Sequence, residues 1–202
     1  MGDVETPHGP ARVHLHPTDE PRAWLVLGHG AGGGVGARDL VAAADAAHTE
    51  GVGVALVEQP YRVAGRRSPA PARQLDVAWV AVVDELRGTT LEGLPLVVGG
   101  RSSGARVACR TSAATDAVGV LCLAFPLRPP RRKQGAEPPS RLDELDAVTV
   151  PVLVVQGVRD PFGIPPAGTT RAVVEVSADH SLRTDLEAVR AAIGGWLRDV
   201  VP

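Results

Sequence analysis

The sequence predicts an α/β fold in which a mostly parallel sheet of about seven strands is covered by helices on both faces. Short apolar runs recur along the 202 residues, and their continuous Val and Leu character is typical of strands buried on both faces. Segments with apolar residues at helical spacing lie between these runs. Because no internal repeat or linker divides the chain, we expect residues 1–202 to form one domain.

The expected strands begin with residues 11–16, where apolar and polar side chains alternate. This alternation indicates a half-exposed strand at an edge of the sheet. The other expected strands are continuous apolar runs at residues 24–29, 52–58, 96–100, 118–125, 152–157 and 171–176.

The expected helices are residues 37–50, 72–87, 103–112 and 182–200. Residues 61–73 and 126–141 interrupt the alternation of strands and helices, and both are rich in Pro and Arg. We expect them to form long loops after the carboxyl ends of strands, where open α/β sheets bind ligands.

The overall charge and composition exclude several classes of protein. With 21 basic and 23 acidic residues the net charge is −2, so we expect no nucleic-acid partner. No apolar run approaches the roughly 18 residues of a membrane span, and we expect no membrane association. The N-terminus has no signal-peptide pattern, and two cysteines make no disulfide framework, which together favour a cytoplasmic protein. Nothing in the sequence points to a particular oligomeric state.

The clearest chemical motif is Gly-Arg-Ser-Ser-Gly at residues 100–104, between an expected strand and an expected helix. A G-x-S-x-G sequence in this context predicts a tight turn that exposes the Ser102 hydroxyl as a nucleophile. Small flanking residues let the strand and the helix approach closely. The alternative interpretation is an ordinary glycine-rich turn between a strand and a helix.

A serine nucleophile needs a base, and His180 is the best candidate among the six histidines. It follows the last expected strand, where the chain order nucleophile, acid, histidine places the base. Asp160 follows the strand at residues 152–157 and is the first candidate for the carboxylate that orients the base. Asp179 is the second candidate, because the side chain of an adjacent residue usually diverges from the imidazole. Taken alone, His180 and Asp160 also fit ordinary loop and turn positions.

Acyl-transfer chemistry also needs donors for the developing oxyanion. The glycine-rich segment at residues 28–34 follows a strand, and we expect the N–H groups of Ala31 and Ser103 to serve as these donors. The same segment matches G-x-G-x-x-G, with Glu58 as a conceivable ribose partner, so dinucleotide binding is an alternative interpretation. It leaves Ser102, Asp160 and His180 without a role.

No metal site is expected. His14 and His16 alternate along one strand face, but no cluster of carboxylates or cysteines joins them. Cys109 and Cys122 fall on an expected helix and an expected strand, and both are expected to be core residues.

The combined motifs resemble the α/β-hydrolase superfamily over about residues 24–182. They are His-Gly-Ala-Gly-Gly at residues 29–33, residues 99–104, residues 155–160 and residues 179–182. The resemblance is greatest to small hydrolases with little or no lid, distantly similar to dienelactone-hydrolase-like enzymes. Residues 58–62 and 65–67 resemble the same group.

The resemblance implies an α/β-hydrolase fold with little or no lid, with Ser102 as nucleophile, Asp160 as acid and His180 as base. Ser103 departs from the pattern, because relatives often have a larger apolar residue there. The implied activity is hydrolysis of an ester, thioester or related acyl bond of a small substrate through an acyl-serine intermediate, with no cofactor. Since the group includes members of protein assemblies, a non-catalytic binding or scaffold protein is the alternative.

Positive charge is concentrated in the two expected loops. Residues 61–73 hold four arginines and no acidic residue, and residues 126–141 hold four arginines and Lys133 against Glu137. Tyr61, Arg62 and Arg101 are therefore candidates for binding a substrate that carries a carboxylate or phosphate. The alternative is that both loops are simply solvated.

Overall fold

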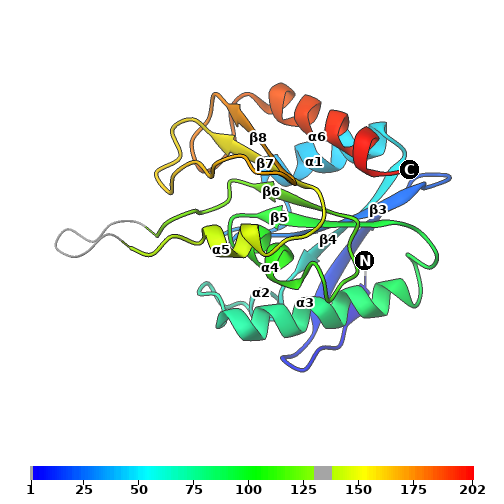
Figure 1. The fold of residues 1–202 in the computed structure, drawn as a ribbon. Coiled ribbons are helices and arrows are strands. Elements are labelled where there is room, and N and C mark those ends of the chain that lie inside the picture. Colours follow the sequence, from blue (N-terminus) through cyan, green and yellow to red (C-terminus); the bar gives the residue numbers. More distant parts are fainter. Residues whose placement is uncertain (1, 130–137) are drawn as a thin grey trace.

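An eight-stranded sheet forms the centre of the protein in a computed structural model, which describes residues 2–129 and 138–202 (Figure 1). Its strands are β1 (Gly2–Val4), β2 (Ala11–His16), β3 (Ala23–Gly28), β4 (Val52–Glu58), β5 (Leu96–Arg101), β6 (Gly119–Leu123), β7 (Val152–Gly157) and β8 (Arg171–Val176). The helices of the described residues are α1 (Arg38–Thr49), α2 (Pro60–Val63), α3 (Ala72–Arg87), α4 (Ser103–Thr111), α5 (Leu142–Asp146) and α6 (Leu186–Val200).

The strand order of the sheet is β1-β2-β4-β3-β5-β6-β7-β8. The pairs β1/β2 and β2/β4 are antiparallel, and all other pairs are parallel. The chain therefore leaves β3 toward one side of the sheet and later leaves β5 toward the other. Such a reversal opens a crevice at the carboxyl ends of the two strands, and open α/β sheets bind ligands there.

Two apolar cores separate the sheet from its helices. One lies between the sheet and α3, α4 and α5, with Trp79 and Phe125 among its fully buried side chains. The other lies between the opposite face and the pair α1 and α6, which pack against each other (Figure 1). Alternate strand residues serve opposite cores, as Val97 and Val98 do, which is why the strands are continuously apolar. Among the described helices none is both long and apolar enough to cross a membrane.

The predicted fold class is confirmed, and the differences lie at the margins. The sheet has eight strands rather than about seven, because β1 pairs with β2 through only three residues whose side chains carry no pattern. The alternation of residues 11–16 predicted a strand at an edge of the sheet, but β1 lies outside β2, so β2 is not the outermost strand. The expected loop at residues 61–73 begins inside the one-turn helix α2. Residues 130–137 of the other expected loop lie outside the described residues.

The last helix begins later than the expected residues 182–200. Leu182 and Asp185 have φ angles of 47° and 55°, which belong to the left-handed region and cannot continue a right-handed helix. The helix therefore begins at Leu186. Leu182 still packs fully buried in the core beneath α6, so its apolar side chain agrees with the predicted stripe although its backbone does not.

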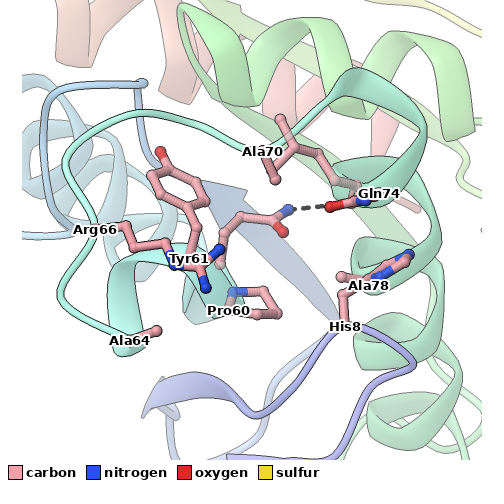
Figure 2. Close-up of a pocket in the computed structure, with 10 residues that line it drawn as sticks. His8, Pro60, Tyr61, Ala64, Arg66, Ala70, Gln74 and Ala78 are labelled. Atoms are coloured by element: carbon pink, nitrogen blue, oxygen red, sulfur yellow. Dashed lines mark hydrogen bonds between the residues drawn. The ribbon is translucent and has the colours of Figure 1, made fainter.

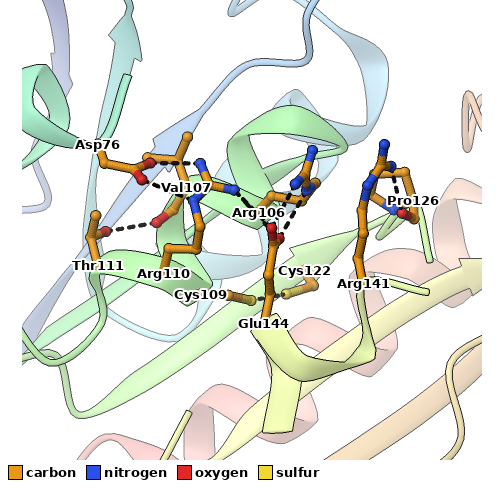
Figure 3. A network of polar contacts seen from close by, with 10 residues as sticks. All are labelled: Asp76, Arg106, Val107, Cys109, Arg110, Thr111, Cys122, Pro126, Arg141 and Glu144. Atoms are coloured by element: carbon orange, nitrogen blue, oxygen red, sulfur yellow. Dashed lines mark hydrogen bonds and ion pairs between the residues drawn. The ribbon is translucent and has the colours of Figure 1, made fainter. Parts of the chain in front are cut away.

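A network of ion pairs holds α4 against its neighbours (Figure 3). Arg106 donates two hydrogen bonds to Glu144 of α5, at 2.8 and 2.5 Å. Arg110 donates to both carboxylate oxygens of Asp76 in α3, at 2.9 and 2.6 Å, and also reaches Glu144. The Glu144 side chain is only 15% exposed, so its charge is poorly screened. One carboxylate thus anchors two arginines of the helix that follows Ser102.

We predict that Glu144→Gln lowers the free energy of unfolding by about 1–3 kcal/mol, because two partly buried guanidinium groups lose their shared charge partner. Urea unfolding followed by circular dichroism measures the change. The matched control is Asp45→Asn, which removes the partner of Arg190 in an ion pair exposed by 42% and 52%. It should cost less than about 0.5 kcal/mol. Equal losses in the two variants would contradict the prediction.

Candidate active site

Ser102 stands on a strained turn between β5 and α4. Its backbone has φ 52° and ψ −105°, a conformation that residues with a side chain rarely adopt. The Ser102 N–H donates to the Leu123 carbonyl of β6 at 2.8 Å, and the Ser102 carbonyl accepts from Arg106 N–H in α4. Hydrogen bonds on both sides hold the turn in place.

Glycines make this turn possible because the backbones of β3, β5 and α4 touch there. A Cβ atom on Gly100 would lie 2.5 Å from the Gly28 carbonyl oxygen and 2.8 Å from the Gly104 backbone. A Cβ atom on Gly104 would clash with the same Gly28 oxygen. The two glycines of the predicted motif are therefore sterically required, as the sequence indicated.

A continuous chain of hydrogen bonds links Ser102, His180 and Asp160. The Ser102 hydroxyl lies 2.9 Å from His180 Nε2, and His180 Nδ1 lies 2.8 Å from Asp160 Oδ2. Since the carboxylate only accepts, Nδ1 carries the proton and Nε2 is able to accept from the serine. The three residues come from the ends of β5, β7 and β8, so the parallel sheet brings them to one edge.

The Asp160 carboxylate is fully buried and held on both oxygens. Oδ2 also accepts from Gln156 Nε2 at 2.8 Å, and Oδ1 accepts from the Phe162 N–H at 2.9 Å. The rival carboxylate, Asp179, accepts instead from the N–H and hydroxyl of Ser181, and these bonds lower the pKa of Asp179. Asp160, rather than Asp179, is therefore the carboxylate that orients the His180 imidazole.

Two further contacts hold the base. The Phe162 ring packs against the His180 ring, with centroids 4.3 Å apart. Arg101, the residue before Ser102, donates from Nη2 to the His180 carbonyl at 3.1 Å. Sequence reasoning assigned no role to Gln156 or Phe162, although Gln156 lies within the motif at residues 155–160 and Phe162 is two residues after it.

The segment after β3 lies directly beside the turn at Ser102. A Cβ atom on Gly30 would lie 3.6 Å from Ser102 Cβ, in ordinary contact, but only 2.7 Å from Arg101 Nη1, so a side chain there would displace the Arg101 guanidinium. His29 is buried; its Nδ1 lies 2.8 Å from the Gly30 carbonyl, and its Nε2 accepts from Gln59 N–H at 3.1 Å. Both ring nitrogens are thus used to shape the loop.

The N–H groups expected to form an oxyanion hole are unpaired. Within residues 2–129 and 138–202, neither Ala31 N–H nor Ser103 N–H makes a hydrogen bond. Ser103 begins α4, whose first N–H groups have no partner inside the helix. The Ala31 carbonyl accepts from the Tyr61 hydroxyl at 3.0 Å, which fixes the loop on its other side.

The three candidate substrate-binding residues have different environments. Tyr61 is buried, and its hydroxyl is bound to Ala31. Arg101 is paired with Asp39 and with the His180 carbonyl. Arg62 has a buried Nε without a hydrogen-bond partner in the described part of the chain. Tyr61 and Arg101 therefore shape the site, while substrate contact by any of the three stays a prediction.

A hollow of about 100 Å³ lies behind Tyr61, between α2 and the start of α3 (Figure 2). His8, Pro60, Arg66 and Gln74 are among the residues that line it. Because the Tyr61 ring lines this hollow while its hydroxyl holds Ala31, the side chain connects the hollow to the active-site loop.

The remaining candidate residues have structural partners. Glu58, the conceivable ribose partner, lies 3.3 Å from His14 Nε2 on the neighbouring strand. No group of three or more potential metal ligands occurs among the described residues. Cys109 and Cys122 are buried core residues with their sulfur atoms 3.5 Å apart.

The family model described as an alpha/beta hydrolase domain matches residues 21–186. A search of curated proteins finds no match.

Several solved structures share the fold. The serine hydrolase XC6422 from Xanthomonas campestris, which has no lid, is 19% identical with a TM-score of 0.76; the match covers 100% of this chain and 94% of that one. Est1E from Butyrivibrio proteoclasticus, solved with ferulic acid, is 15% identical with a TM-score of 0.79, covering 100% and 99%. Dienelactone hydrolase from Anabaena variabilis is 16% identical with a TM-score of 0.79, covering 100% and 97%. At these identities the likeness is one of fold.

We predict that Tyr61→Phe lowers kcat for p-nitrophenyl acetate about three- to thirtyfold with little change in KM. Without the hydroxyl the Ala31 peptide is less well held, and an oxyanion donor acts mainly on the transition state. Thr111→Val is the control, because it removes a comparable buried bond, from Thr111 Oγ1 to the Val107 carbonyl, within α4. The control should keep the wild-type kcat. A raised KM with unchanged kcat in Tyr61→Phe would instead assign Tyr61 to substrate binding.

We predict that protonation of His29 lowers the free energy of unfolding as the pH falls. Burial lowers the pKa of His29 below its ordinary value, and Nε2 must stay unprotonated to accept from Gln59 N–H. A lowered folded-state pKa means that the unfolded chain binds more protons, so this contribution is present above about pH 6.5 and is lost as pH falls below it. Urea unfolding at pH 7.5 and 5.5 should show a larger loss for wild type than for His29→Asn. Equal losses would refute it.

Proposed function

Because this chain belongs to the alpha/beta hydrolase domain family, we propose that it is a serine hydrolase that cleaves an ester, thioester or related acyl bond of a small substrate. The observation that carries the proposal is the unbroken chain of hydrogen bonds from Ser102 through His180 to Asp160. The proposal takes residues 1–202 as one hydrolase domain, and it requires no cofactor.

The first half of the reaction forms an acyl-enzyme. Ser102 Oγ attacks the substrate carbonyl carbon while His180 Nε2 takes the hydroxyl proton. Asp160 accepts from His180 Nδ1 and stabilises the imidazolium that results. The carbonyl oxygen becomes an oxyanion, and the N–H groups of Ala31 and Ser103 donate to it. The leaving alcohol or thiol then takes the proton from His180 Nε2.

The second half releases the acid. A water molecule gives a proton to His180 Nε2 and attacks the acyl carbon through the same oxyanion geometry. Breakdown of this intermediate returns the proton to Ser102 Oγ and frees the carboxylic acid. Est1E, which shares the fold, has been solved with ferulic acid bound, and this supports a small carboxylic acid or its ester as ligand here.

The proposal is tested with a fluorophosphonate probe, which reacts only with an activated serine. We expect the wild-type protein to be labelled at Ser102 and Ser102→Ala to remain unlabelled. Labelling of His180→Ala should be at least about a thousandfold slower, because the serine loses its base. The control is Ser68→Ala, which changes an exposed serine of the loop before α3 and should be labelled as wild type. A folded wild-type protein without labelling would instead support a non-catalytic binding or scaffold role.

A further inference from the structure

A hollow of about 440 Å³ opens directly beside the catalytic groups, on the side of the sheet covered by α1. Its wall includes Gly32 and Gly33 of the loop after β3, and Ser181, which follows His180. Arg101, which precedes Ser102, is also part of the wall. Ser102 and His180 are therefore each next in sequence to a residue of this wall, which places the hollow beside the proposed reaction centre.

Two of the charged residues in this wall, Arg101 and Asp39, neutralise each other. Arg101 Nε lies 2.9 Å from Asp39 Oδ2, and Asp39 is only 1% exposed. The contact is an ion pair without the alignment of a hydrogen bond. Arg101 Nη2 also donates to the His180 carbonyl, so two of the three guanidinium nitrogens are engaged within the protein. Arg101 is therefore a fixed part of the wall rather than a free cation.

Two further arginines line the hollow without such partners. Arg38 begins α1 and Arg183 follows the His180 segment, and both are exposed. Neither side chain makes a hydrogen bond or ion pair among the described residues. The hydrogen bonds from Ser181 to the Asp179 carboxylate are the main cause of the lowered pKa of Asp179, and Arg183 also helps to lower it. Counting Arg38, Arg101 and Arg183 against Asp39, the wall carries a net charge of +2.

From these contacts we infer that the hollow binds a carboxylate or phosphate group of the substrate through Arg38 and Arg183. Guanidinium groups bind these planar or tetrahedral anions with paired hydrogen bonds, and a concave wall of one charge concentrates anions near it. The inference rests on the proposed hydrolase function and specifies its substrate class. Of Tyr61, Arg62 and Arg101, the candidates from the sequence, only Arg101 lines this hollow.

The test compares kcat/KM for esters that differ by one carboxylate. One pair, p-nitrophenyl propionate and mono-p-nitrophenyl succinate, places the charge on the acyl side. The other, phenyl acetate and 4-acetoxybenzoate, places it on the leaving group. We expect the wild-type enzyme to prefer the anionic ester in at least one pair, and the preference to weaken as NaCl is raised. The pair that shows the preference identifies the part of the substrate in the hollow.

The double variant Arg38→Gln/Arg183→Gln should lower this anionic-to-neutral ratio about tenfold. The control is Arg198→Gln, which removes an exposed arginine paired with Glu50 near the start of β4, at the opposite edge of the sheet. It removes the same kind of charge and should leave the ratio at the wild-type value. An unchanged ratio in the double variant, or an equal fall in the control, overturns the inference.

A binding measurement separates this inference from the proposed function. Calorimetric titration of Ser102→Ala with inorganic phosphate and with succinate should show binding that Arg38→Gln/Arg183→Gln abolishes. If fluorophosphonate labelling fails but this binding is present, the anion site stands and the hydrolase function falls. If labelling succeeds but neither anion binds and the ester ratio is unchanged, the function stands and the anion site falls.

Discussion

The contact between the backbones of Gly28, Gly100 and Gly104 determines how the whole site is built. Gly28 and Gly100 are register partners at the carboxyl ends of the two central strands, β3 and β5. With no side chain between them, the loop after β3 lies against the turn after β5, and α4 begins directly over both. The proposed oxyanion donors, Ala31 and Ser103, therefore come from two separate segments that meet at one point. A methyl group at Gly100 or Gly104 would push these segments apart, and one at Gly28 would press on the Trp79 ring, 3.1 Å away.

His180 and its carboxylate partner Asp160 reach the same point from the other half of the sheet. Asp160 and His180 follow β7 and β8, and a parallel sheet places all such ends on one edge. The residues around them act mainly on orientation: Gln156 and Phe162 N–H hold the carboxylate, and Arg101 holds the main chain of His180. Arg101 precedes Ser102 and donates to the His180 carbonyl, so the two halves of the site are connected by a hydrogen bond that does not involve the serine side chain.

The sequence predicts those features that depend on residues close together in the chain. The Ser102 motif, the buried strands and the chain order of Asp160 and His180 are local patterns, and the structure brings these three residues together. Side-chain partners such as Asp39 for Arg101 were not predictable, because they join segments far apart in the sequence. The same is true of Arg38 and Arg183, which belong to no charge run and meet only in the fold. Strand β1 and the start of α6 depend on backbone pairing and backbone angles, for which the side chains give little signal.

The left-handed backbone of Ser102 implies a trade-off between stability and reactivity at this one position. A residue with a Cβ atom in such a conformation costs about 1–3 kcal/mol, which the surrounding hydrogen bonds and glycine contacts must offset. Alanine keeps that cost and so, under the proposed function, gives an inactive protein with the native turn. Glycine would remove it, and the inactive protein would then be more stable than the active one. The wild-type chain retains the less stable choice, which is the expected mark of a residue kept for its hydroxyl.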